Sequence, residues 1–166
     1  MEKRNLGNTG TKVGALGIGA MSFSDFYGPT NTQESHAILK LALDSGIDHI
    51  DTAKVYGMGL SEERIGQFLN TLSPNDRQFF KIATKGGIDR KNFDDKGTVV
   101  FDNSKEFLTE ELDNSLKRLG MECVELYYVH RREADRSIEE VTETLVGFIK
   151  AGKKKQFGFS EKDPTA

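Results

Sequence analysis

Short apolar segments recur along this chain at a nearly constant interval, with amphipathic segments between them. They begin near residues 15, 47, 79, 124 and 156, so three of the four intervals are 32 residues long. A strand–helix–strand alternation of this period is typical of parallel strands joined by right-handed crossover connections. The repeat therefore predicts an α/β fold in which strands and helices alternate along the chain.

Turn residues and apolar spacing set the boundaries of the predicted elements. The segment 3–13 has the pattern of a hairpin, with turn residues at positions 7–10. Glycine follows three of the four predicted helices, as it often does at helix C-termini. The predicted strands cover residues 15–19, 47–51, 79–84, 124–129 and 156–160, and the predicted helices cover residues 32–45, 61–69, 104–119 and 137–151.

Two α/β architectures accommodate this order of elements: a doubly wound open sheet, or part of a (β/α)8 barrel. The third interval is longer than the others because it contains a polar, glycine-bearing insertion at residues 86–103, GGIDRKNFDDKGTVVFDN. The length of 166 residues is that of one ordinary domain, so we expect residues 1–166 to form a single domain.

Composition and charge narrow the class of protein. Hydrophobic residues make up 36% of the chain and charged residues 30%, which is typical of a soluble globular domain. No apolar run is long enough to cross a membrane, and no apolar segment follows the charged N-terminus as in a secretory signal. The single cysteine, Cys123, fits a reducing compartment, and the net charge of −3 does not favour nucleic-acid binding. We therefore expect a cytoplasmic protein that binds neither membranes nor nucleic acid.

Ionisable side chains stand at the carboxyl ends of the predicted strands. Asp51 ends the second strand, Lys85 ends the third and His130 ends the fourth, while Tyr56 lies on the glycine-rich loop after the second. Each of them alone has an ordinary structural explanation, such as a loop cap, a packing residue or a solvated charge. In parallel α/β folds, however, the carboxyl ends of the strands form one rim, so their coincidence predicts a functional site there.

The four residue types also form a chemically coherent set. A free phenol has a pKa of about 10, and a nearby ammonium group lowers that pKa by stabilising the phenolate. A carboxylate beside the lysine would hold it charged, and an imidazole facing the phenol could donate a hydrogen bond to a substrate carbonyl. The set suits reduction of a carbonyl group, in which the phenol delivers the proton. Because no side chain donates hydride, the reaction requires a cofactor.

Two other kinds of site fit the sequence less well. The segment GIGAMS resembles a dinucleotide-binding loop, but Ser22 stands where the fingerprint needs its third glycine. The next predicted helix also begins about ten residues later, too far away for its N-terminus to point at a pyrophosphate. The three histidines, His36, His49 and His130, lack the spacing of metal ligands, so we expect no metal site.

Nearly the whole chain resembles the N-terminal half of an aldo-keto reductase. The motifs DTAKVYG and ELYYVHR are the most specific parts of the resemblance, and FYGPT and YYVHR are similar to general NADP-dependent members from bacteria and fungi. The resemblance implies a TIM barrel and the reduction of aldehydes or ketones to alcohols with NADPH. It rests on the segments LGNTGTKVGALGIGAMSFSDFYGPT, GIDHIDTAKVYGMGLSEERIG, IATKGGI, LDNSLKRLGMECVELYYVHR and IEEVTETLVGFIKAGKKKQFGFSE.

The resemblance also implies roles for individual residues. Tyr56 would be the proton donor, Lys85 the partner that lowers its pKa, and Asp51 the carboxylate paired with Lys85. His130 would orient and polarise the carbonyl group of a small-molecule substrate. The residues implied to contact the cofactor are Gly19, Met21, Asp51 and Ser160.

Three further positions carry weaker implications. Phe26 and Tyr27 are candidates for lining the substrate pocket. Lys54 stands where relatives often carry an acidic residue, and we expect this difference to leave the type of reaction unchanged.

The family builds eight strands, whereas only strands one to five, after an N-terminal hairpin, are predicted here. Strands six to eight would be absent, and with them much of the site for the cofactor's phosphates. An open five-stranded parallel sheet has two unpaired edges, so we expect self-association or pairing with the missing half-barrel. Two functions remain open. The chain is an NADPH-dependent carbonyl reductase or its catalytic half, or it is an inactive truncated or regulatory relative that does not bind the cofactor by itself.

Overall fold

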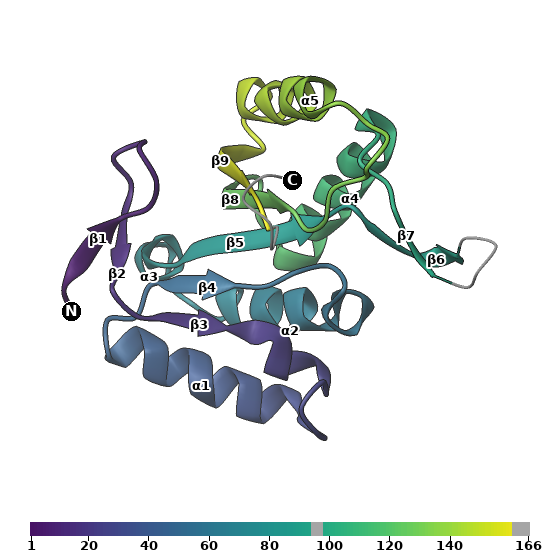
Figure 1. Ribbon diagram of the computed structural model, residues 1–166. Coiled ribbons are helices and arrows are strands. Elements are labelled where there is room, and N and C mark those ends of the chain that lie inside the picture. Colours follow the sequence, from purple (N-terminus) through teal and green to yellow (C-terminus); the bar gives the residue numbers. More distant parts are fainter. Residues whose placement is uncertain (94–97, 161–166) are drawn as a thin grey trace.

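A parallel sheet of five strands forms the centre of the computed structural model, which describes residues 1–93 and 98–160. The strands lie side by side in the order in which they occur in the sequence, and every neighbouring pair is parallel (Figure 1). A doubly wound sheet reverses its strand order, whereas a barrel does not. The expected part of a (β/α)8 barrel is therefore confirmed. Its strands are β3 (Gly17–Gly19), β4 (His49–Asp51), β5 (Lys81–Gly86), β8 (Val124–Val129) and β9 (Lys154–Phe159).

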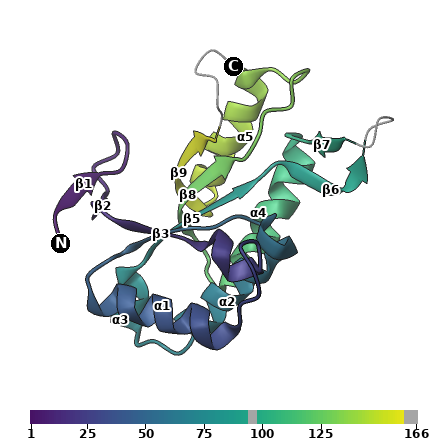
Figure 2. The ribbon, with the colours of Figure 1, turned by 60° about the horizontal axis from the view of Figure 1, so that its bottom comes forward.

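Helices connect these strands and pack along the outer side of the curved sheet, as Figures 1 and 2 show. Two short 3-10 helices, η1 and η2, follow β3 and β4 and lie beside each other. The helices are η1 (Ala20–Ser24), α1 (Thr32–Asp44), η2 (Tyr56–Gly59), α2 (Leu60–Leu69), α3 (Pro74–Phe79), α4 (Lys105–Leu119) and α5 (Ile138–Lys150). In the described part of the chain, no helix has the length and apolar character needed to cross a membrane.

The hydrophobic core lies between the sheet and the helices. Ile50 of β4 and Ile82 of β5 are fully buried and belong to one cluster with Leu39 of α1 and Ile65 of α2. Because successive side chains of a strand point to opposite faces, Asp51 next to Ile50 projects away from this core. The apolar face thus fixes the sheet on the helices and leaves its other face for polar side chains.

Serine residues determine where three of the helices begin. The hydroxyls of Ser73, Ser104 and Ser137 each accept a hydrogen bond from a backbone N–H in the first turn of α3, α4 and α5. The predicted helices at 104–119 and 137–151 therefore start one residue early, at the cap. Helix α3 was not predicted, because its six residues are too short for an apolar period and none of them is buried.

Two antiparallel hairpins lie at opposite ends of the sheet (Figure 1). The first, β1 (Lys3–Asn5) with β2 (Lys12–Gly14), is the hairpin predicted at residues 3–13, and it lies beside the N-terminal ends of the strands. The second, β6 (Ile88–Phe93) with β7 (Val99–Phe101), extends from the carboxyl end of β5. The sequence predicted only a polar insertion there.

Candidate active site

Asp51 and Lys85 form an ion pair at the carboxyl ends of β4 and β5. In the parallel register, Asp51 lies beside Ala83, so Lys85 stands two residues further along the next strand and on the same face. Its ammonium group donates to the Asp51 carboxylate and to the Thr52 carbonyl, the latter over 2.8 Å. The Lys85 side chain is only 7% exposed, whereas that of Asp51 is 35% exposed. The cation is thus enclosed and held from two sides.

Tyr56 is brought over this ion pair by a tight loop. Its hydroxyl oxygen lies 3.4 Å from Lys85 Nζ, which is 5.1 Å from the centre of the phenol ring. Gly57 and Met58, directly after it, both adopt left-handed backbone conformations, with φ of 63° and 55°. A Cβ atom on Gly57 would lie 2.7 Å from the Cβ of Ser24 in η1. The loop therefore needs glycine at this position to turn back and place the phenol.

His130 completes the set from the end of β8. Its backbone N–H donates to the Gly86 carbonyl over 2.8 Å, and its ring stands edge-on to that of Tyr56, with 5.9 Å between the ring centres. Burial, together with the charges of Lys85, Arg131 and Arg90, lowers the pKa of His130 to about 4. The imidazole is therefore neutral near pH 7. Its Nδ1 is buried and has no hydrogen-bond partner among the described residues.

The predicted cofactor residues occupy the two sides of this set. Gly19 ends β3, pairs in register with Asp51 and is exposed, and no atom lies within 4 Å of the Cβ that it lacks. Ser160 follows β9, where its N–H donates to the Val129 carbonyl over 2.9 Å. Met21 lies in η1 and is half-buried. Gly19 and Ser160 thus lie at opposite edges of the described sheet, with Asp51, Lys85 and His130 between them.

The weaker candidates for the substrate pocket lie on the exposed loop after η1. Phe26 and Tyr27 are 64% and 73% exposed and contact each other edge to face. Their loop is anchored by the buried Arg64, whose guanidinium donates to the carbonyls of Phe23 and Thr30 over 2.7 and 3.2 Å.

Lys54 is the other position singled out by the resemblance. Its side chain forms a buried ion pair with Glu111 of α4, with 2.9 Å between Nζ and Oε1. Burial nevertheless raises the pKa of Glu111, because desolvation outweighs the nearby cation. Lys54 thus connects the loop after β4 to a helix.

Arg131 and Asn103 contact the loop of His130, and sequence reasoning assigned neither of them a function. The Arg131 guanidinium donates to the carbonyls of His130 and Ser160. The motif ELYYVHR already contains Arg131, so its position next to His130 was a usable signal. Asn103 lies in the insertion, where no pattern marks it, and its contact to the Arg131 carbonyl spans 28 residues.

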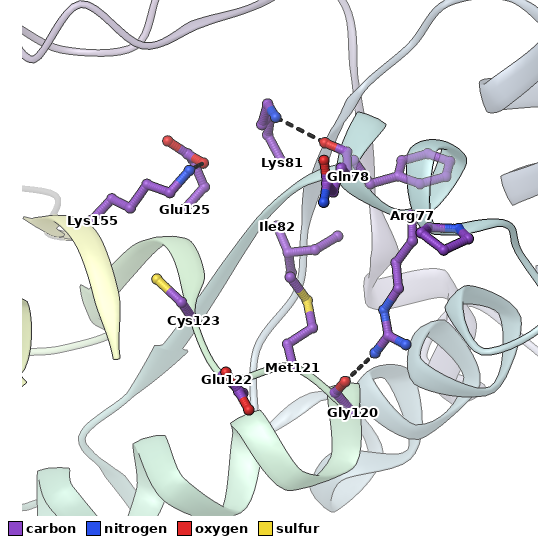
Figure 3. Close-up of a pocket in the computed structure, with 12 residues that line it drawn as sticks. Arg77, Gln78, Lys81, Ile82, Gly120, Met121, Glu122, Cys123, Glu125 and Lys155 are labelled. Carbon is purple, nitrogen blue, oxygen red and sulfur yellow. Dashed lines mark hydrogen bonds and ion pairs between the residues drawn. The ribbon is translucent and has the colours of Figure 1, made fainter. Parts of the chain in front are cut away.

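Two hollows of the described chain lie away from this set. A hollow of about 660 Å³ lies at the opposite end of the sheet, among the N-terminal ends of β5, β8 and β9 (Figure 3). Arg77 and Cys123 line it, and burial raises the pKa of the Cys123 thiol. A second hollow of about 690 Å³ lies between α4 and α5. Within residues 1–93 and 98–160, no three His, Cys, Asp or Glu side chains cluster as metal ligands do.

Comparisons with known proteins identify the family of the chain. The sequence model of the aldo/keto reductase family matches residues 15–166. The Aldo-keto reductase yakc [NADP(+)] of Schizosaccharomyces pombe is 35% identical over 158 residues, which cover 95% of this chain and 45% of the relative. The L-glyceraldehyde 3-phosphate reductase of Escherichia coli K12 is 34% identical over 167 residues, covering 99% of this chain and 46% of the relative.

A solved structure gives the same result. The holo form of the aldo-keto reductase AKR11C1 from Bacillus halodurans superimposes with a TM-score of 0.81 at 31% identity, over 96% of this chain and 50% of that one. The chain spans about half the length of the relatives it matches. On the family match and these identities, the chain belongs to the aldo/keto reductase family.

Proposed function

We propose that this chain carries the proton-transfer machinery of an NADPH-dependent reductase of small aldehydes or ketones. One observation carries the proposal: a single buried ammonium group, that of Lys85, contacts the Asp51 carboxylate and lies 3.4 Å from the Tyr56 hydroxyl. An ammonium ion so close to a phenol stabilises the phenolate that remains after the proton has left. This arrangement suits the protonation of an alkoxide formed from a carbonyl.

Tyr56, Lys85 and Asp51 have different roles in the proposed proton transfer. Tyr56 gives its hydroxyl proton to the carbonyl oxygen as negative charge develops there. Lys85 compensates the charge of the phenolate, and Asp51 and the Thr52 carbonyl hold the Lys85 ammonium in place. Because Lys85 is buried, its interaction with the phenol is screened less by water than a surface contact would be.

His130 has a different function in this proposal. A pKa of about 4 leaves the imidazole neutral at pH 7, so it is not an efficient proton source there. A neutral ring still carries one N–H, which can donate a hydrogen bond to the carbonyl oxygen and orient it toward Tyr56. The edge-on packing of the two rings places the imidazole beside the phenol, where a bound carbonyl could reach both.

Gly19, Asp51 and Ser160, with Met21 beside them in η1, would hold the nicotinamide end of NADPH. The open space at Gly19 fits close approach of a ring or ribose, and Ser160 stands partly exposed at the far edge of the set. When bound, the reduced nicotinamide supplies the hydride. The S. pombe relative, which carries NADP(+) in its name, supports this choice of cofactor.

We also propose a partner for the open sheet. In the described part, β3 and β9 are edge strands, and the matched relatives are about twice as long as this chain. A segment equivalent to the remaining part of those relatives, called here the C-terminal half, would pair with these edges and complete the cofactor site.

The single cysteine and the mixed surface charges support a cytoplasmic location.

The test is a titration with NADPH, followed by cofactor fluorescence, and turnover of a reactive aldehyde. Both are measured for the chain alone and for the chain mixed with the C-terminal half of the S. pombe relative. Binding and turnover in either preparation support the proposal. If the folded chain shows no NADPH binding and no aldehyde turnover in either preparation, it is instead a non-catalytic relative that retains the motifs.

A further inference from the structure

We propose that Arg131 is a positioning residue that locks the catalytic His130 to the cofactor-side residue Ser160. The assignment of these two partners rests on the proposed function, whereas the contacts of Arg131 do not. No resemblance or motif assigned a function to this arginine, although it follows His130 directly in the sequence.

The guanidinium bridges the ends of two neighbouring strands. Its Nη1 donates to the His130 carbonyl over 2.7 Å and also to the Ser160 carbonyl. The N–H groups of the same two residues already donate to the strands before them, His130 to Gly86 and Ser160 to Val129, over 2.8 and 2.9 Å. Arg131 therefore satisfies two carbonyls that lie just past the end of the β8–β9 ladder. Since hydrogen bonds from a charged donor are stronger than neutral ones, this bridge stiffens both strand ends together.

The backbone of Arg131 is held by a different residue, Asn103. Its carbonyl accepts a hydrogen bond of 3.1 Å from the amide of Asn103, a residue that is 1% exposed. Asn103 and Glu133 also exchange two hydrogen bonds: the Asn103 N–H donates to Glu133 Oε2 over 2.8 Å, and the Glu133 N–H donates to Asn103 Oδ1 over 2.9 Å. Gly87 leaves room for Asn103, because a Cβ there would lie 2.8 Å from its amide nitrogen. The segment 130–133 is thus fixed by Gly86 at the end of β5, by Ser160 after β9 and by Asn103 before α4.

The bridge also affects the charge around the imidazole. His130 faces Lys85 from β5, Arg90 from β6, Arg131 from its own loop and the Tyr56 phenol, while Asp51 is paired with Lys85. The three cations oppose protonation of the ring. Removing Arg131 should loosen the strand end and make protonation of His130 easier. A residue that only supported the fold would not change this titration selectively.

The experiment measures His130 and Ser160 directly, without cofactor or turnover. Three histidines, His36, His49 and His130, make the imidazole signals easy to follow by NMR, and His130→Gln assigns the third. In Arg131→Met, the pKa of His130 should rise toward the ordinary value, and the Ser160 amide should exchange its hydrogen about 10-fold faster, as expected when local opening becomes easier. Arg77→Met is the matched control, because Arg77 also donates to a backbone carbonyl, that of Gly120, but at the far end of the sheet (Figure 3).

Arg131→Lys keeps the charge but loses the planar guanidinium, so it separates the two effects. In this variant the pKa of His130 should stay low, while the Ser160 amide should still exchange its hydrogen faster than in the wild type. Arg131→Lys also replaces Arg131→Met as the test variant if Arg131→Met does not fold. An unchanged His130 titration and Ser160 exchange in Arg131→Met would overturn the proposal, as would equal shifts in Arg77→Met. If Arg131→Met does not fold, unchanged Ser160 exchange in Arg131→Lys would overturn it. Absence of NADPH binding and of aldehyde turnover, both for the chain alone and for the chain mixed with the C-terminal half, would contradict only the proposed function.

Discussion

Lys85 Nζ lies 3.4 Å from the hydroxyl oxygen of Tyr56 and is held there by its ion pair with Asp51. Three segments of the chain meet at this point: the end of β4, the start of η2 and the C-terminal end of β5. The relationship joins the fold to the proposed chemistry, because the parallel register of β4 and β5 determines how far Lys85 stands from Asp51.

Asp51→Asn tests whether the ion pair serves the site. The variant leaves Lys85 with a weaker partner and a less defined position. Loss of a charge-assisted hydrogen bond of roughly 1.5–3 kcal/mol predicts that turnover of a reactive aldehyde falls by about 10- to 100-fold. Stability should fall by only about 1 kcal/mol or less, because the Asp51 side chain is about one-third exposed.

Asp44→Asn is the control for that change, since Asp44 forms an exposed i,i+4 ion pair with Lys40 on α1. Turnover with this variant should equal that of the wild type, and urea unfolding should give a stability within about 0.5 kcal/mol. If both variants lose turnover to the same extent, the ion pair at Lys85 has no special function.

The lowered pKa of His130 should make the folded chain less stable in acid. Its pKa is about 4 in the folded chain, against 6.5 for the ordinary side chain. Between these values the unfolded state binds the proton and the folded state does not. The free energy of unfolding is therefore at its full value above pH 6.5 and decreases as the pH falls toward 4. The loss is up to about 3 kcal/mol. Urea unfolding from pH 7 to pH 4 measures it, and His130→Gln should show a smaller decrease; equal decreases would contradict the assignment.

The loop after Tyr56 should tolerate no side chain at Gly57. Gly57→Ala places a methyl group 2.7 Å from the Ser24 Cβ and 2.9 Å from the Leu60 Cβ, in a left-handed conformation. The backbone strain costs about 1 kcal/mol and the overlap roughly 1–3 kcal/mol more. Gly10→Ala is the matched control, with φ of 82° and no atom within 4 Å, and should lose only the backbone part. Equal losses in urea unfolding would show that the contact with η1 is unimportant.

Lys154 offers a stabilising substitution. Its side chain is 1% exposed, lies 4.4 Å from the Phe157 ring centre and has no hydrogen-bond partner for Nζ among the described residues. Burial lowers its pKa to about 7, so between pH 7 and 10.5 the unfolded state holds a proton that the folded state has released. The free energy of unfolding should therefore increase as the pH rises from 7 to 10.5, and decrease again as the pH is lowered over the same range.

Lys154→Met removes the buried amine and should raise the free energy of unfolding at pH 7 by about 1–3 kcal/mol. It should also abolish the rise of stability between pH 7 and 10.5. Lys153→Met, at a partly exposed lysine that pairs with Asp113, should change stability by about 0.5 kcal/mol or less. A destabilised Lys154→Met chain would contradict this prediction.

The sequence predicted the strand order and the types of residue at the strand ends because both depend on local patterns. Asp51 and His130 stand where an apolar segment stops. The third strand was predicted at residues 79–84, but β5 continues to Gly86, because Lys85 and Gly86 pair with Tyr128 and Val129 of β8. That extension depends on a neighbouring strand 43 residues away and leaves no local signal.

Other features escaped prediction for the same reason. The β6–β7 hairpin is built from a short, mostly polar segment, and its pairing of Ile88 with Phe101 is visible only once the chain has folded. The bridge from Arg131 to Ser160 spans 29 residues and joins a side chain to a backbone carbonyl. A carbonyl is present in every residue, so no sequence pattern marks such a partner.

Turnover of a reactive aldehyde by Tyr56→Phe tests the central claim most directly. The substitution removes one hydroxyl group and keeps the ring that packs against His130. In whichever preparation turns over aldehyde, the chain alone or the chain with the C-terminal half, turnover should fall by about 10²- to 10⁴-fold, the usual contribution of a general acid. NADPH binding should remain unchanged in the same titration. Turnover within twofold of the wild type would contradict the assignment of Tyr56 as proton donor.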